Sequence, residues 1–323
     1  RYAVMDTQTA INDMLTGKMS EADMAKYLTD LADRGETVED LVGAAKAMRK
    51  HVTSIIAPAD AIDCCGTGGD GRKTLNISTA VAFIVAACGV PVAKHGNRSA
   101  SSQSGAADVL EALDIPLDPS FDQLEEALDV VGYCFLMAPL HHRAMAHVAN
   151  VRKSLGRRTI FNLLGPLVNP AAVRRQMVGV FAKEWVRPMA EALKVLGSEA
   201  AWVVHGDGLD EITLDGPTWV AKLDSKGNIT EEVLQPEDFG LPRTGSNEAI
   251  RGADAAYNAQ KLRALLEGEK SAYRDVVLAN SAAALVMTGF AKDLKDGVAK
   301  AANSVDDGHA LDILNDYRTH VSS

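Results

Sequence analysis

The chain has 323 residues, a length that accommodates one large α/β domain together with a smaller companion. Its composition, 47% hydrophobic and 24% charged residues, is ordinary for a soluble globular protein. A net charge of −10 argues against a general nucleic-acid-binding protein, which normally carries a basic excess, but it leaves room for a local basic pocket.

Targeting and membrane signals are not recognisable in the sequence. The first twenty residues are polar and mixed in charge, and the longest apolar run, 80–93, is too short to span a bilayer. The four cysteines show no C-x-x-C spacing, which favours free thiols in a reducing compartment. We therefore expect a cytoplasmic protein that makes no use of a membrane.

The N-terminal residues 1–57 are predicted to form a small helical domain. Apolar residues recur at helical spacing (Met14, Leu15, Met24, Leu28 and Leu31), and another helix is expected from Val38 to about His51. Helices near 144–170 are expected to complete this domain. The remainder, 58–323, is predicted to be a large α/β domain.

A strand, a glycine-rich loop and a helix follow one another between residues 61 and 89. The run 61–65 predicts a buried strand, the loop GTGGDG occupies 66–71, and Asn76, Ser78 and Thr79 begin a helix that Gly89 ends. In this layout the backbone N–H groups of the loop and of the helix N-terminus face an anion, and glycine permits its close approach. The segment therefore predicts a phosphate site.

Two better-known phosphate motifs fit this loop poorly. Gly66, Gly68 and Gly71 satisfy G-x-G-x-x-G, but the following strand, 90–93, leads to Lys94 and His95 where a dinucleotide site needs an acid. An extra Arg72 before Lys73 spoils the spacing of a P-loop. We therefore expect phosphate binding of another kind.

A second polar loop is expected immediately after the strand 90–93. It reads KHGNRSASS over 94–102, and Gly105 then begins a helix, 106–113. Cations, an amide and hydroxyls at the carboxyl end of a strand are suited to binding further ligand oxygens. The alternative is a solvated polar loop.

A third strand, 133–137, precedes a histidine pair and a basic helix, 143–156. His141, His142 and His147 lack the spacing and the cysteine partners of a zinc site. Arginines gather nearby, and at least one could clamp a carboxylate, although a solvated helix face would explain any two of them: Arg152, Arg157 and Arg158.

The pattern of strand, helix and strand over 177–204 predicts a mostly parallel central sheet flanked by helices. The strand 201–204 leads to a glycine-containing loop with Asp210 and Glu211. Adjacent carboxylates at a strand end suit Mg²⁺, which takes one or two carboxylates together with ligand phosphates, whereas an acidic surface turn is the alternative. From Ala253 onward the sequence predicts helices and shows no chemistry.

These segments together resemble the anthranilate phosphoribosyltransferase family. The matching stretches are GTGGDGRKTLNIST at 66–79, KHGNRSASSQSGAADVLEAL at 94–113, VRKSLGRRTIFNLLGPLVNP at 151–170 and GLDEIT at 208–213. The resemblance covers essentially the whole chain. It implies a helical domain and an α/β domain with the active site between them, and a homodimer.

The resemblance also implies the reaction and the residues that serve it. Members of the family transfer phosphoribose from phosphoribosyl pyrophosphate to the amine of anthranilate, with Mg²⁺, here expected as two ions. Anthranilate would be bound by Gly66, Asn97 and Arg152, and the metal by Ser78, Asp210 and Glu211. Phosphoribosyl pyrophosphate would be bound by Gly66, Gly69, Asp70, Thr74, Asn76, Ile77, Ser78, Thr79, Lys94, His95, Gly96, Asn97, Arg98, Ser99, Ala100, Ser101, Ser102 and Ala106.

Departures from the family pattern are mild. The commoner HPAMK reads His142-Arg143-Ala144-Met145-Ala146 here, Asn150 replaces a usual proline, and Ala106 replaces a frequent serine. Because of these departures, the motifs do not determine the route by which anthranilate would enter the site. Two alternatives share this fold: a pyrimidine-nucleoside phosphorylase, disfavoured by Asp70 and by Asn97-Arg98, and a non-enzymatic nucleic-acid-binding paralogue, disfavoured by the negative charge.

Overall fold

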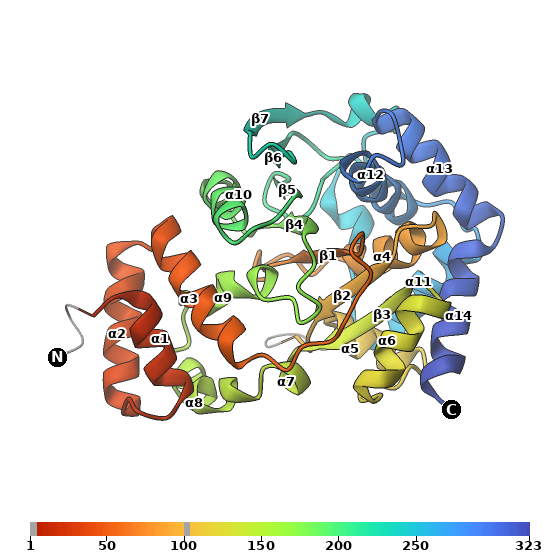
Figure 1. Cartoon of the computed structure of the whole chain (residues 1–323). Coiled ribbons are helices and arrows are strands. Elements are labelled where there is room, and N and C mark those ends of the chain that lie inside the picture. The colour runs from red at the N-terminus through yellow and green to blue at the C-terminus, as the bar shows by residue number, and fades with distance from the viewer. Residues whose placement is uncertain (1–4, 100–103) are drawn as a thin grey trace.

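A seven-stranded sheet forms the centre of the molecule. In the computed structural model, which describes residues 5–99 and 104–323, its strands are β1 (Ile62–Gly66), β2 (Val92–Gly96), β3 (Tyr133–Met137), β4 (Arg175–Gly179), β5 (Ala200–His205), β6 (Thr218–Leu223) and β7 (Ile229–Leu234). They lie in the order β3-β2-β1-β4-β5-β6-β7 (Figure 1). The first five are parallel, and β6 and β7 are antiparallel additions at one edge.

Alternate residues of the inner strands face two separate hydrophobic clusters. Cys64, Met177 and Trp202 belong to one cluster, whereas their neighbours Cys65 and Val178 belong to the other. Successive side chains of a strand point to opposite faces, so a strand covered on both sides is apolar throughout. The two faces of the sheet are therefore both buried.

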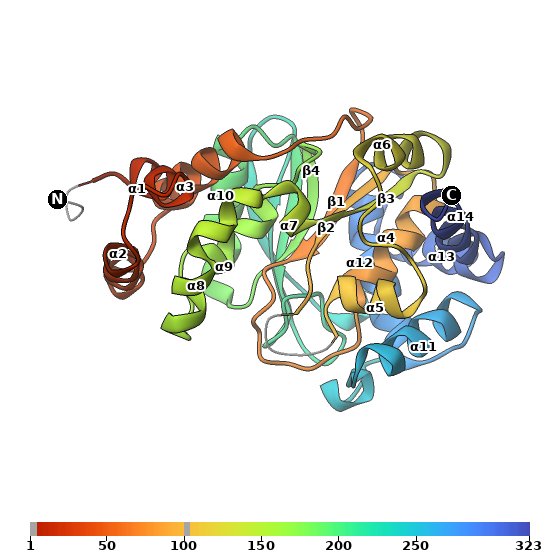
Figure 2. The same cartoon turned by 90° about the horizontal axis from the view of Figure 1, so that it is seen from below.

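Helices cover one face of the sheet from β3 to β5 (Figure 1). They are α4 (Ile77–Ala87), α5 (Ala106–Ala112), α6 (Phe121–Val130), α11 (Ala255–Leu266), α12 (Ala272–Met287), α13 (Leu294–Asp306) and α14 (His309–Val321). The largely apolar α4 lies innermost and contacts α12 and α14. Figure 2 shows α11 lying beside α5, and the two helices are in contact.

The opposite face carries α10 (Val186–Val195) and a bundle of helices. The bundle consists of α1 (Thr7–Leu15), α2 (Glu21–Arg34) and α3 (Val38–His51), against which α8 (Ala146–Leu155) and α9 (Phe161–Leu164) pack. A short helix, α7 (Ala138–His141), and a 3-10 turn, Arg143–Met145, lead into α8. The segments 5–51 and 143–164, distant in sequence, thus form one helical body.

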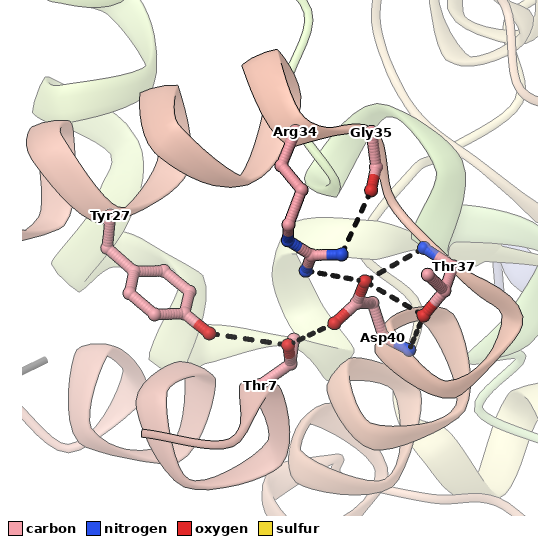
Figure 3. A network of polar contacts seen from close by, with 6 residues as sticks. All are labelled: Thr7, Tyr27, Arg34, Gly35, Thr37 and Asp40. Carbon is pink, nitrogen blue, oxygen red and sulfur yellow. Dashed lines mark hydrogen bonds and ion pairs between the residues drawn. The ribbon is translucent and has the colours of Figure 1, made fainter. Parts of the chain in front are cut away.

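A buried carboxylate fastens the start of this bundle (Figure 3). Asp40 accepts hydrogen bonds from Thr7 Oγ1 at 2.5 Å, from Thr37 N at 2.8 Å and from Arg34 Nη2 at 2.9 Å. Burial raises its pKa, but the hydrogen bonds from Thr7, Thr37 and Arg34 outweigh that effect and leave the pKa of Asp40 below its usual value. One side chain therefore joins α1, the end of α2 and the capping box of α3.

The predicted fold class, a small helical domain with a mostly parallel α/β domain, is confirmed; the domain boundary at residue 57 stays a prediction. The strand expected at 90–93 is wrong in its bounds, because β2 continues to Gly96 and pairs Lys94 with Phe135 of β3. Among the described residues, none of the helices combines the length and the apolar character needed to cross a bilayer.

Candidate active site

The glycine loop and the acidic loop meet at the carboxyl edge of the sheet. The loop after β1 and the loop after β5 leave neighbouring parts of this edge, separated by β4. Gly68 N donates to Asp210 Oδ2 at 2.8 Å, and Asp210 N donates to Asp70 Oδ2 at 3.2 Å. The two segments that the sequence predicts to bind phosphate and Mg²⁺ therefore form one surface.

Glycine is required where these loops cross. A Cβ on Gly66 would lie 2.5 Å from Asp210 Oδ2, and a Cβ on Gly179, at the end of β4, would overlap the backbone carbonyl of Asp210. Gly68 and Gly69 adopt φ values of 66° and 74°, which side-chain-bearing residues rarely do. The two loops can cross here because Gly66 and Gly179 have no side chain to collide with Asp210.

Lys94 occupies the interior beneath the two loops. It is 2% exposed, and its ammonium donates to Cys64 O at 2.6 Å and to Ser78 Oγ at 3.1 Å. Ser78 and Glu211 line one small interior cavity. The predicted ligands Ser78 and Glu211 are thus brought together, with a buried cation beside them.

The acidic side chains carry unfavourable charge in this position. Burial and the neighbouring Asp70 raise the pKa of Asp210 to about 7. Burial and Asp210 likewise raise the pKa of Glu211 well above its usual value. A divalent cation would relieve this repulsion, and a hydroxyl with two carboxylates is an oxygen donor set that Mg²⁺ accepts.

The donor set is incomplete by itself. In the described part of the chain, no three His, Cys, Asp or Glu side chains come together as a metal-holding group. Mg²⁺ characteristically completes its coordination with substrate phosphates and water. The residues present therefore fit an ion that binds together with a phosphorylated substrate.

Asn76 connects the glycine loop to the second polar loop. It stands at the N-cap of α4, yet within the described structure its side chain makes no capping hydrogen bond; its Nδ2 donates to Ser104 O at 2.7 Å. The first turn of α4, with Ile77 and Thr79 buried, therefore keeps backbone N–H groups for an anion.

The second loop is closed by an acid that the sequence analysis does not single out. Asp108 accepts from Ser99 N at 3.1 Å and from Gly105 N at 3.0 Å, and it pairs with Arg98. Arg98 also pairs with Glu111, so its guanidinium is directed to α5. The predicted ligands Ala100, Ser101 and Ser102 lie outside the described residues.

A cavity of about 470 Å³ adjoins the glycine loop on the side of the helical bundle. Gly66, Asn97 and Arg152, the residues predicted to bind anthranilate, all line it. Apolar side chains supply much of the remaining wall: Met48, Ala138, Pro139, Met145, Ala149, Phe161, Leu164 and Val168. The three residues are thus brought together at one apolar hollow.

The charge of this cavity contrasts with that of the chain. Among the described residues that line it, the charged ones are Arg143 and Arg152, and none is an aspartate or glutamate. Burial lowers the pKa of His95 to about 3 and that of His142 to about 4, so both lining histidines are neutral. A chain of net charge −10 therefore contains a cationic, largely apolar hollow suited to an aromatic carboxylate.

Two side chains show how a flat acid could be held. The Arg152 guanidinium lies 5.5 Å from the centre of the Phe161 ring. His95 Nδ1 lies 3.1 Å from Gly165 O and must donate to that carbonyl, while His95 Nε2 has no hydrogen-bond partner among the described residues. The neutral imidazole of His95 and the guanidinium of Arg152 thus line the same cavity.

Sequence reasoning misses part of this cavity. From the sequence, His142 is considered as a zinc ligand, and His142 and Arg143 lie in the motif that departs from the family pattern, but neither Arg143 nor Phe161 is predicted to line a cavity. Their shared position depends on the packing of α8 and α9 against the sheet, which no spacing in the sequence reveals. The family motif containing His142 and Arg143 is the available signal.

Comparison with known proteins identifies the family. The glycosyl transferase family helical bundle domain matches residues 5–52, and the glycosyl transferase family a/b domain matches residues 58–311. Anthranilate phosphoribosyltransferase from Rhodopseudomonas palustris strain BisB5 is 53% identical over 306 residues, 94% of this chain and 90% of the relative. This chain belongs to the anthranilate phosphoribosyltransferase family.

Solved structures of anthranilate phosphoribosyltransferases share the fold. The Thermus thermophilus enzyme superposes with a TM-score of 0.93 at 40% identity, covering 98% of this chain and 95% of that one. The Saccharomyces cerevisiae enzyme in complex with PRPP and Mg gives 0.90 at 28% identity, covering 98% and 93%. The same yeast enzyme with 4-fluoroanthranilate gives 0.89 at 27%, covering 98% and 92%. The resemblance inferred from the motifs is confirmed.

Proposed function

We infer that this chain transfers phosphoribose from phosphoribosyl pyrophosphate to the amine of anthranilate and releases pyrophosphate. The observation that carries this inference is the acid-free cavity with Arg143 and Arg152 beside a glycine loop at the carboxyl edge of the sheet. An anionic aromatic ring and a phosphorylated sugar would then lie next to each other across Gly66 and Asn97. Membership of the family supports the same reaction.

Phosphoribosyl pyrophosphate would bind across the two loops. The N–H groups of the glycine loop and of the first turn of α4 would face its phosphates, and Lys94 would supply a buried positive charge. Arg98 is paired with Asp108 and Glu111. Its main role would therefore be to hold the second loop in place, and direct contact with a phosphate would be secondary. The predicted roles of Ala100, Ser101 and Ser102 stay predictions.

Mg²⁺ would be held by Ser78, Asp210 and Glu211. The family resemblance suggests that two ions bind. When bound, the metal would neutralise charge on the pyrophosphate leaving group. The yeast enzyme's complex with Mg supports this use of the metal. Lys94 and the loop N–H groups other than those of Thr67, Gly68 and Arg72, which are bonded within the protein, would stabilise the same charge.

The chemical step requires positioning rather than a strong base. The bond from ribose C1 to the pyrophosphate oxygen breaks as the amine nitrogen of anthranilate bonds to C1, and the nitrogen then loses a proton. An aromatic amine is already neutral at pH 7, so it is nucleophilic without prior deprotonation. Holding amine and C1 in line could lower the barrier by up to about 7 kcal/mol.

The decisive assay follows the loss of anthranilate fluorescence after addition of phosphoribosyl pyrophosphate and Mg²⁺. We expect turnover that stops when the metal is chelated. Thymidine phosphorolysis without anthranilate turnover would instead identify a nucleoside phosphorylase, and a DNA mobility shift without turnover would identify a binding protein. The homodimeric state and the cytoplasmic location stay predictions, which sedimentation and fractionation would test.

A further inference from the structure

The C-terminal helices hold the phosphate-binding loop by a set of side-chain contacts centred on Asn76. Asn258, on α11, donates from Nδ2 to Asn76 Oδ1 at 3.1 Å. Tyr273, on α12, donates its hydroxyl to Asn76 O at 2.7 Å. Both side chains are buried, with exposures of 1% and 3%. Asn76 is thus held through its side chain and its backbone from two helices whose sequence shows no chemistry.

The strand-like stretch before α11 reinforces this contact. Leu75 N donates to Ile250 O at 2.8 Å, and Gly252 N donates to Lys73 O at 2.7 Å. A Cβ on Gly252 would lie 2.8 Å from Thr74 O and 3.0 Å from Asn258 Oδ1, so this approach requires glycine. Residues 73–75, the part of the loop nearest to α4, are therefore paired with residues 250–252.

The two ends of the Asn258 side-chain amide make different contacts. Its Oδ1 accepts from Ala253 N at 2.8 Å, which closes the N-terminal turn of its own helix, while only its Nδ2 reaches Asn76. Asn76, having its side-chain oxygen occupied by Asn258, directs its own Nδ2 to Ser104. The chain of contacts therefore runs from α11 through Asn76 to the second loop.

We propose that Asn258 and Tyr273 are positioning residues for phosphoribosyl pyrophosphate binding. They fix Asn76 so that its amide ties the two ligand-binding loops together and the first turn of α4 keeps its N–H groups for the phosphates. Neither residue lines the cavity assigned to anthranilate. This inference rests on the proposed function, since it assigns those loops to phosphoribosyl pyrophosphate.

Two conservative variants test it. Asn258→Asp keeps the size of the side chain and the acceptor for Ala253 N, but it removes the donor to Asn76. Tyr273→Phe removes one hydroxyl. We expect each to raise the KM and the calorimetric Kd for phosphoribosyl pyrophosphate about tenfold, the effect of one lost hydrogen bond, and to leave the KM for anthranilate unchanged.

Tyr317→Phe is the matched control. Tyr317, on α14, is equally buried and its hydroxyl accepts from Phe135 N at 3.1 Å, so the variant loses a similar bond away from the loop. It should lower the melting temperature without changing the KM for phosphoribosyl pyrophosphate. Hydrogen exchange should be faster over residues 73–79 in Asn258→Asp and Tyr273→Phe, and not in the control.

The outcomes separate the two inferences. A wild-type chain that neither binds phosphoribosyl pyrophosphate nor consumes anthranilate overturns the proposed function. If the wild type is active but the two variants only melt earlier, with an unchanged KM and Kd for phosphoribosyl pyrophosphate, the positioning role is overturned. An equal rise in both KM values would also overturn it, because it would indicate a general loss of structure.

Discussion

Gly68 and Asp210, 142 positions apart in the sequence, are joined by a hydrogen bond of 2.8 Å from the glycine N–H to the aspartate Oδ2. The position of the glycine loop therefore depends on an acid that is also a predicted Mg²⁺ ligand. Replacing this carboxylate by an amide would preserve an oxygen for Gly68 while removing the charge. The structural and the metal-binding contributions of Asp210 can accordingly be separated.

We predict that Asp210→Asn combined with Glu211→Gln lowers turnover by at least about tenfold and raises the Mg²⁺ concentration needed for half-maximal rate. Kinetics over a Mg²⁺ titration measure both effects. Asp207→Asn is the control, because Asp207 is an exposed acid of the same loop. A double variant with the wild-type Mg²⁺ requirement would contradict the assignment of these carboxylates to the metal.

Arg152→Ala should raise the KM for anthranilate by roughly tenfold to a hundredfold, since a charge-assisted bond to its carboxylate would be lost. Arg152→Lys should recover only part of that loss, because an ammonium cannot reproduce the planar fork above Phe161. Steady-state kinetics against both substrates give the answer. Arg157→Ala serves as the control, because Arg157 is exposed and paired with Asp33. An unchanged KM in Arg152→Ala would count against the clamp.

Arg143 is exposed at the same cavity, and it has no ion pair among the described residues. We predict that Arg143→Gln slows the association of anthranilate severalfold and weakens the dependence of its association rate on salt, while dissociation changes little. Stopped-flow fluorescence at several ionic strengths measures this. Lys153→Gln removes an equal charge from the exposed side of α8 and should leave the rate unchanged; identical behaviour of the two variants would refute steering by Arg143.

Histidine burial predicts how the stability of the protein depends on pH. Burial lowers the pKa of His95 to about 3 and that of His142 to about 4, whereas an unfolded histidine titrates near 6.5. Between these values the unfolded chain binds more protons, so the free energy of unfolding should fall as the pH decreases from about 6.5 to about 4. Each histidine contributes a slope of up to about 1.4 kcal/mol per pH unit.

Urea denaturation at pH 7, 6, 5 and 4.5 tests this dependence on His142. His142→Asn should flatten the curve relative to that of the wild type. Equal slopes in the wild type and in His142→Asn would show that His142 does not titrate as its burial indicates.

The sequence predicted those parts of the site that local patterns determine. The glycine loop, the start of α4 and the acidic doublet each lie within a few consecutive residues, and their meeting follows from the rule that parallel strands end at one edge. The extent of β2 was not predictable in the same way. Lys94 and His95 look like loop residues, but Cys64 O, Ser78 Oγ and Gly165 O provide partners that allow them to be buried.

The cavity that we propose for anthranilate shows a second limit of prediction from the sequence. Its walls include residues of β1, β2, α3, α7, the 3-10 turn Arg143–Met145, α8 and α9. The exposure of Arg143 beside the half-buried Arg152 depends on how the helical body packs on the sheet. Hydrophobic periodicity identifies each of these elements but not their mutual placement. Family resemblance supplied Asn97 and Gly66 and selected Arg152 among three arginines that could clamp a carboxylate, whereas the wall positions of Phe161 and Arg143 became evident only in three dimensions.

Asn76 depends on contacts from Asn258 and Tyr273, which lie late in the sequence. This dependence matters when truncated or frameshifted genes of the family are assessed for whether they encode an active enzyme. A polypeptide that stops after residue 213 would retain the four main motif stretches, from GTGGDGRKTLNIST to GLDEIT. It would nevertheless lack α11 and α12, the two helices that hydrogen-bond to Asn76 in the loop. Survey methods that score an open reading frame by its signature stretches alone would count such a product as an active enzyme, although its substrate loop would have lost the anchors on which its shape depends.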